Sequence, residues 1–128
     1  MATEYAHRFG TTVVVLHKQR ESGTETEVTH VVGDVRDRPC LVIDDMISTA
    51  GTMAESVEAL LGAGARPEMV IAATHGLLLA EAREKLAHAA IREVFVTDTV
   101  ACPAEEWPQV RVVSVAPVIA AAIRRSIA

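Results

Sequence analysis

Short apolar runs alternate with segments of helical periodicity along the 128 residues of the chain. Each run is rich in Val and Ile, which is typical of parallel strands that are covered on both faces. The runs expected to form strands are Thr12–Leu16, Leu41–Ile43, Val70–Ala73, Val94–Val96 and Val110–Val115. Because parallel strands are joined by right-handed crossovers, the pattern predicts an α/β fold with an open, mostly parallel sheet and helices on both faces.

The first amphipathic helix is expected over Thr52–Leu61, where apolar residues recur at helical spacing. Thr52 and Glu55 form the Thr-x-x-Glu pattern of a capping box, which predicts that the helix begins there. Gly62 and Gly64 are expected to end it.

Two further helices follow along the chain. One is expected over about Leu78–His88, with Glu81 and Lys85 at the i, i+4 spacing of an ion pair. The last follows Pro117, a residue favoured in the first turn of a helix. Its apolar side is formed by Ile119, Ile123 and Ile127.

The polar stretch Lys18–His30 interrupts the apolar pattern, with Gly23 near its middle and a β-rich piece at Glu27–Val32. It is expected to form a protruding, flexible hairpin or loop. Such segments frequently carry function.

Two adjacent acids, Asp44 and Asp45, follow the apolar run Leu41–Ile43. Open α/β folds bind ligands at the carboxyl ends of their parallel strands. Carboxylates at that edge are acceptors for ligand hydroxyl groups. The pair therefore predicts a site for a hydroxyl-bearing ligand.

The segment Ser48–Thr52, called the 48–52 loop below, joins these acids to the first expected helix. Ser48, Thr49 and Thr52 supply hydroxyl donors, and Ala50 and Gly51 allow close approach of the backbone. The new helix directs its free N–H groups and the positive end of its dipole at an anion. Acids and loop together predict a site for a sugar phosphate.

Composition limits the class of partner. The net charge is -5, and the 12 Lys and Arg residues form no basic stripe, so a nucleic-acid partner is not expected. No apolar stretch approaches the roughly 18 residues that span a bilayer, and the first residues lack the regions of a signal peptide. A membrane partner is therefore not expected either, and the cytoplasm is the expected location.

Cysteine and histidine spacings give no reason to expect a zinc site. Cys40 and Cys102 are the only cysteines, and neither is assigned a role. The histidines lack the H-x-x-x-H and H-E-x-x-H spacings. They are His7, His17, His30, His75 and His88.

In order along the chain, several motifs resemble the carboxy-terminal half of the ribose-phosphate pyrophosphokinases, also called phosphoribosyl-pyrophosphate synthetases. Asp44–Thr52 resembles the phosphoribosyl-pyrophosphate loop of the type I phosphoribosyltransferase fold. The other segments that match are Val31–Val35, Ala73–Gly76, Val96–Thr99, Val113–Pro117 and Ala122–Arg125.

The resemblance implies a ribose 5-phosphate site in an enzyme that transfers pyrophosphate from Mg-ATP to the 1-hydroxyl group of ribose 5-phosphate. Asp44 and Asp45 would accept hydrogen bonds from the ribose 2- and 3-hydroxyls. Lys18 and Arg20 would be catalytic, because cations stabilise the charge that develops in phosphoryl transfer. The residues implied to hold the 5-phosphate are Ser48, Thr49, Ala50, Gly51 and Thr52.

The chain departs from the family pattern in three respects. Ser48 stands where many members have a third Asp, and Gln19 replaces a commonly basic residue. The expected single domain, residues 1–128, also lacks counterparts of the amino-terminal half and of the first-strand pyrophosphate loop.

We therefore expect the chain alone to bind ribose 5-phosphate without turnover. ATP is expected to bind only with an amino-terminal half, and Mg²⁺ is expected to be held mostly by the missing part. The resemblance also implies a homo-oligomer in nucleotide biosynthesis.

Two other functions remain open. A non-catalytic regulatory subunit would keep the 48–52 loop and lose the chemistry, and a phosphoribosyltransferase acting on a base would share the loop. A response-regulator receiver would need its acids on the first strand, and a P-loop would need G-x-x-x-x-G-K-[ST], which is absent.

Overall fold

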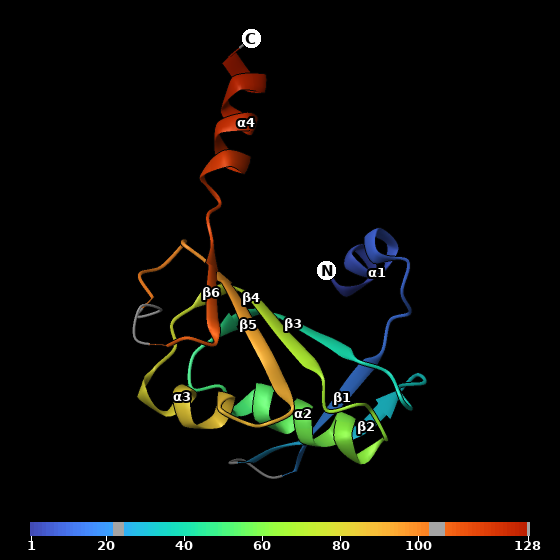
Figure 1. Ribbon diagram of the computed structural model, residues 1–128. Coiled ribbons are helices and arrows are strands. Elements are labelled where there is room, and N and C mark those ends of the chain that lie inside the picture. Colours follow the sequence, from blue (N-terminus) through green and yellow to red (C-terminus); the bar gives the residue numbers. More distant parts are fainter. Residues whose placement is uncertain (22–24, 103–106, 128) are drawn as a thin grey trace.

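The computed structural model describes residues 1–21, 25–102 and 107–127, and of residues 18–21 and 25–29 it describes the backbone alone. Figure 1 shows the arrangement of the elements. In chain order they are α1 (Ala2–Phe9), β1 (Val15–Glu21), β2 (Glu25–Val32), β3 (Cys40–Ile47), α2 (Gly51–Gly62), β4 (Met69–Gly76), α3 (Ala80–Leu86), β5 (Ile91–Thr97), β6 (Val110–Val113) and α4 (Ala116–Ile127).

Four parallel strands form the main sheet, in the order β3-β4-β5-β6. Val42 lies opposite Ile71, which lies opposite Val94, so apolar residues form a continuous row across the sheet. The predicted α/β class and parallel sheet are confirmed. All carboxyl ends of these strands meet at one edge, where the chain turns into α2 and α3.

Helices α2 and α3 cover one face of this sheet, and α1 lies on the other side (Figure 1). The buried face of α2 contributes Met53, Val57 and Leu60, which belong to the same core cluster as Ile71 and Val94. This packing fixes α2, and therefore its N-terminus, against the sheet.

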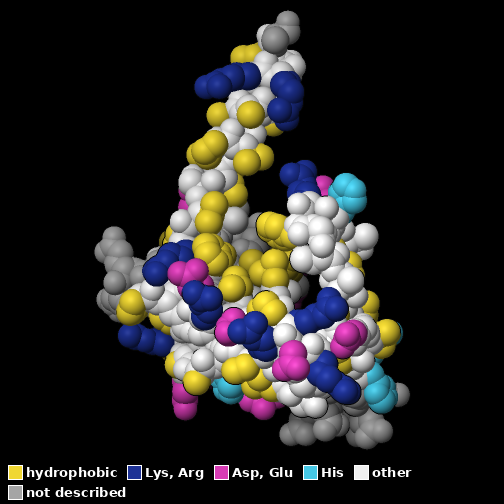
Figure 2. All heavy atoms as spheres, turned by 45° about the vertical axis from the view of Figure 1, so that its right-hand side comes forward, with side chains coloured by type: hydrophobic (Ala, Val, Ile, Leu, Met, Phe, Trp, Pro, Cys, Tyr) yellow, Lys and Arg dark blue, Asp and Glu magenta, His cyan; other side chains and the backbone are white. Residues whose placement is uncertain are grey.

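Helix α4 differs from the other helices because none of its residues is buried. It extends away from the sheet (Figure 1), and hydrophobic side chains lie exposed along it and in the hollow between α4 and α1 (Figure 2). The predicted apolar side, including Ile123, is therefore exposed. Within the described residues, no helix is both long and apolar enough to cross a membrane.

The prediction of a parallel strand at Thr12–Leu16 is wrong. The strand found there, β1, starts later and pairs antiparallel with β2 in a separate two-stranded sheet. An apolar run cannot by itself distinguish a parallel strand from one arm of a hairpin, and chain neighbours pair readily as a hairpin. Lys18, Gln19 and Arg20 consequently lie in a strand rather than in a loop. The predicted hairpin is present, while its expected flexibility concerns in part residues 22–24, which lie outside the described residues.

The start of α2 also differs from the prediction. Ala50 is the N-cap, in the left-handed conformation with φ 60°, and no side-chain capping bond is present, so the Thr52–Glu55 capping box is wrong. Glu55 Oε2 is buried without a hydrogen-bond partner among the described residues. The helix ends at Gly62, one residue beyond the expected last residue Leu61.

Helix α3 is shorter than the predicted segment Leu78–His88, because Leu78 has φ 47° and therefore cannot continue a right-handed helix. The predicted pair of Lys85 with Glu81 is confirmed, with Nζ 3.3 Å from Oε2.

Candidate functional site

The two acids lie within β3, which runs four residues beyond the predicted end at Ile43. Asp44 is half-buried and Asp45 is exposed. The backbone N–H of Asp45 donates to Asp44 Oδ1 at 2.8 Å, which orients the Asp44 carboxylate and leaves its second oxygen available. The predicted pair of acceptors is thus present toward the carboxyl end of the strand.

The 48–52 loop follows β3 directly and leads into the first turn of α2. Ser48, Thr49 and Thr52 are half-buried, and Ala50 is buried. The N–H of Ala54 donates to the Ala50 carbonyl at 3.0 Å. The N–H groups before it have no carbonyl one turn earlier within the helix, so they are available to an anion.

A second turn, Leu77–Leu79, is hydrogen-bonded to the end of β3 and to the start of this loop. Backbone N–H groups of Leu77 and Leu78 donate to the Ile47 carbonyl at 3.0 and 3.1 Å, and the N–H of Leu79 donates to the Ser48 carbonyl at 2.9 Å. The sequence did not predict this contact, because Leu78 and Leu79 fell within the helix expected over about Leu78–His88.

Polar side chains at the ends of β4 and β5 form a hydrogen-bonded network next to the same edge. The Thr97 hydroxyl donates to the Thr74 carbonyl at 2.6 Å, and His75 Nδ1 lies 2.8 Å from Thr99 Oγ1. These residues belong to motifs that carry the resemblance, but the sequence alone predicts no site role for them. Their position directly after a buried strand is the signal that could have indicated one.

Asp98 links the end of β5 to the segment before α4. Its carboxylate accepts a hydrogen bond from the backbone N–H of Val115 at 2.9 Å. The Ser114 hydroxyl and this N–H group hold the pKa of Asp98 below its ordinary value. The bond fixes where α4 leaves the sheet.

The backbone of Lys18 and Arg20 belongs to β1, and their side chains lie outside the described residues. The structure thus brings Asp44, Asp45 and the 48–52 loop together. The catalytic assignment of the two basic residues stays a prediction.

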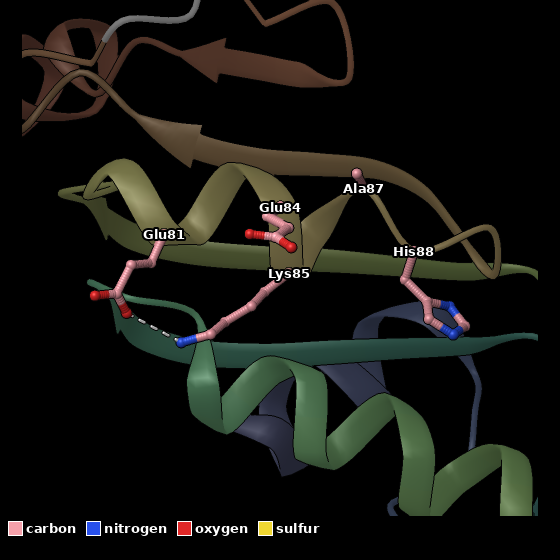
Figure 3. Close-up of a pocket in the computed structure, with 5 residues that line it drawn as sticks. All are labelled: Glu81, Glu84, Lys85, Ala87 and His88. Carbon is pink, nitrogen blue, oxygen red and sulfur yellow. Dashed lines mark hydrogen bonds and ion pairs between the residues drawn. The ribbon is translucent and has the colours of Figure 1, made fainter.

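Two hollows lie away from the 48–52 loop. The hollow beside α3 encloses about 620 Å³ and is lined by Glu81, Glu84, Lys85, Ala87 and His88 (Figure 3). The nitrogen atoms of Lys85 and His88 are already engaged, since Lys85 pairs with Glu81 and His88 Nε2 lies 3.2 Å from Glu58 Oε1. No set of groups converges on a ligand there.

The other hollow, of about 240 Å³, lies between the sheet and α1. Its lining is mostly apolar and includes Ile43, Phe95 and Tyr5, and Asp44 also lines it. Over the described ranges, no three His, Cys, Asp or Glu side chains come together as a metal site. The carboxyl edge with the 48–52 loop is therefore the best-supported site.

Comparison with known proteins agrees with this geometry. Residues 24–128 match the family described as the phosphoribosyl synthetase-associated domain. The ribose-phosphate pyrophosphokinase of Campylobacter jejuni is 40% identical over 124 residues, covering 97% of this chain and 40% of that protein. The enzyme of the same name from Mycobacterium leprae is 43% identical over 118 residues, covering 90% of this chain and 36% of that protein.

A solved structure is also similar. The crystal structure of phosphoribosylpyrophosphate synthetase from Mycobacterium smegmatis matches with a TM-score of 0.80 and 38% identity, over 97% of this chain and 40% of that one. The chain thus spans about two fifths of the length of its relatives. On the matching residues and the shared fold, the chain belongs to the phosphoribosyl synthetase-associated domain family.

Proposed function

We propose that the chain is the ribose 5-phosphate-binding part of a ribose-phosphate pyrophosphokinase. The observation that carries the proposal is the juxtaposition of Asp44 and Asp45 with the 48–52 loop at the N-terminus of α2. Two carboxylates complement a vicinal diol, and a helix N-terminus complements a phosphate. Ribose 5-phosphate carries both groups in one small molecule.

The division of roles follows from the chemistry of each group. Asp44 and Asp45 accept hydrogen bonds from the ribose 2- and 3-hydroxyls. The hydroxyl groups of Ser48, Thr49 and Thr52 donate hydrogen bonds to the 5-phosphate, and the N–H groups of the 48–52 loop, including those of Ala50 and Gly51, add further donors. Binding at both ends fixes the direction of the sugar and thereby presents its 1-hydroxyl group in one orientation.

In the complete enzyme, the reaction would transfer pyrophosphate from ATP to that 1-hydroxyl group. Lys18 and Arg20 would stabilise the transferring group electrostatically, as positioned cations do in phosphoryl transfer. Mg²⁺ bound to the nucleotide would neutralise phosphate charge. The described residues include no group of three or more His, Cys, Asp or Glu that could hold the ion.

ATP would bind with the help of the part of the relatives that this chain does not cover, and the chain alone is proposed to bind without turnover. A homo-oligomer in the cytoplasm is proposed on the same resemblance. The second candidate is a non-catalytic subunit that binds ribose phosphate.

Calorimetry with ribose 5-phosphate and with ribose tests the proposal. Because the loop donors act only on the phosphate, ribose 5-phosphate should bind at least about tenfold more tightly than ribose, which corresponds to about 1.4 kcal/mol. Inorganic phosphate serves as the third ligand and should compete with ribose 5-phosphate. Equal affinities for the sugar and its phosphate would show that the loop is not a phosphate site.

A further inference from the structure

The backbone of the 77–79 turn (Leu77–Leu79) is hydrogen-bonded to Ile47, the last residue of β3, and to Ser48 of the 48–52 loop. Three N–H groups of the turn donate to two consecutive carbonyls, those of Ile47 and Ser48, at 2.9–3.1 Å. In an extended strand, consecutive carbonyls point to opposite sides. Here both point to the same turn.

This arrangement determines where the next N–H groups point. Within a planar trans peptide, the carbonyl of one residue and the N–H of the following residue point in opposite directions. The N–H groups of Ser48 and Thr49 therefore share the side of the loop that faces away from the turn. Successive N–H groups on one side form a concavity that binds anions.

The turn itself is held in a defined path. Leu78 has φ 47°, a conformation that is costly for a leucine, yet its side chain is only 5% exposed and belongs to the core cluster. A Cβ atom on Gly76 would lie 2.7 Å from Val96 Cγ1, so the strand end before the turn is also tightly packed. The buried Leu78 side chain thus anchors the turn in its unusual conformation.

We infer that Leu78 is a positioning residue for the phosphate site, acting through the 77–79 turn on the N–H groups of Ser48 and Thr49. This inference rests on the proposed function for the identity of the ligand. The buried leucine holds the turn, the turn holds two carbonyls, and the carbonyls orient the donors of the 48–52 loop.

The test compares Leu78→Ala with Leu86→Ala in the full chain labelled with ¹⁵N. Leu86 is 0% exposed and lies at the far end of α3, so both variants lose a buried leucine of the same core. Amide spectra without ligand report on the loop directly. In Leu78→Ala the resonances of Ser48 and Thr49 should shift, whereas in Leu86→Ala they should stay near their wild-type positions.

Titration with ribose 5-phosphate adds the functional measurement at a temperature where both variants are folded. Leu78→Ala should bind at least about tenfold more weakly than wild type, and Leu86→Ala within about twofold, because only the first disturbs the preorganised donors. Unchanged loop resonances and affinity in Leu78→Ala, or equal effects in both variants, would overturn the inference. Failure of the wild-type chain to bind would instead count against the proposed function, since the ligand-free spectra test the positioning separately.

If Leu78→Ala does not fold, amide hydrogen exchange of the wild-type chain decides. Ribose 5-phosphate should slow the exchange of the Leu77–Leu79 N–H groups, because a ligand that fixes the loop also fixes its carbonyl acceptors. The same exchange measurement is made with inorganic phosphate in place of ribose 5-phosphate. Exchange at the turn that is unchanged by a ligand that protects Ser48 and Thr49 would overturn the inference.

Discussion

The main sheet with α2 and the protruding helix α4 contain similar apolar side chains in opposite surroundings. Ile71 of β4 is 0% exposed, whereas Ile123 of α4 is 53% exposed. Both positions fit the periodicity of their elements equally well. The difference teaches that periodicity predicts which side of an element is apolar but not what covers that side.

This difference also separates the two regions by function. The buried packing of α2 against the sheet fixes the helix N-terminus and the 48–52 loop beside Asp44 and Asp45. Helix α4 is held at its base by Asp98 and otherwise extends from the sheet (Figure 1). The stability of the candidate site should therefore depend on the first region far more than on the second.

The largest expected effect on the free energy of unfolding is that of Ile71→Ala. Removing a fully buried isoleucine leaves a cavity and should lower the free energy of unfolding by about 2–5 kcal/mol. The matched variant Ile123→Ala should change the free energy of unfolding by no more than about 0.5 kcal/mol, because its side chain is largely exposed. Urea unfolding followed by the fluorescence of the buried Trp107 measures both, and equal losses would remove the contrast between the regions.

A smaller loss of stability is expected for Gly76→Ala, at the carboxyl edge of the sheet. The added methyl group would meet Val96 at 2.7 Å, and such overpacking should lower the free energy of unfolding by about 1–3 kcal/mol. In Gly62→Ala the added group meets nothing within 4 Å, and the change should stay within about 0.5 kcal/mol. Comparable stability of the two variants in the same urea experiment would show that the strand end can relax.

The smallest effect on stability is expected for Asp98→Asn, which removes the carboxylate at the base of α4. The pKa of Asp98 is lowered by hydrogen bonds from the Ser114 hydroxyl and the Val115 N–H group, so the folded state favours the ionised form. This contribution is present above the ordinary Asp pKa of about 3.9 and is lost as the pH falls from there through the lower folded-state pKa. Unfolding curves between about pH 2 and 7 should therefore lose less stability on acidification in Asp98→Asn than in wild type. Parallel curves would contradict this role for the carboxylate.

The sequence allowed the parallel sheet and the position of the candidate site residues in the fold to be predicted, because both depend on local patterns. The run ending in Asp44 and Asp45, followed by the 48–52 loop, needs only strand and helix periodicity to be placed at the carboxyl edge. What could not be predicted depends on contacts between distant segments. The left-handed conformation of Leu78 follows from burial in the core and from the hydrogen bond of its N–H group to the carbonyl of Ile47, at the distant end of β3.

The start of α2 illustrates a second limit. Thr52 and Glu55 have the spacing of a capping box, yet the helix begins at Gly51 because Ala50 takes the left-handed conformation. The hairpin of β1 and β2 illustrates a third, since no feature of the apolar run before Lys18 specified an antiparallel partner. In each case a local pattern had two solutions, and tertiary packing selected one.

The most direct test of the central claim measures ribose 5-phosphate binding by the wild-type chain and by the double variant Asp44→Asn, Asp45→Asn. Loss of two charged acceptors should weaken binding by about 1.5–3 kcal/mol for each carboxylate. The control Asp34→Asn removes an exposed acid that lies 3.9 Å from Arg38 and outside the site, and it should bind like wild type. Tight binding by wild type and control together with its loss in the double variant is the result we expect. Undiminished binding by the double variant would contradict the assignment of the site.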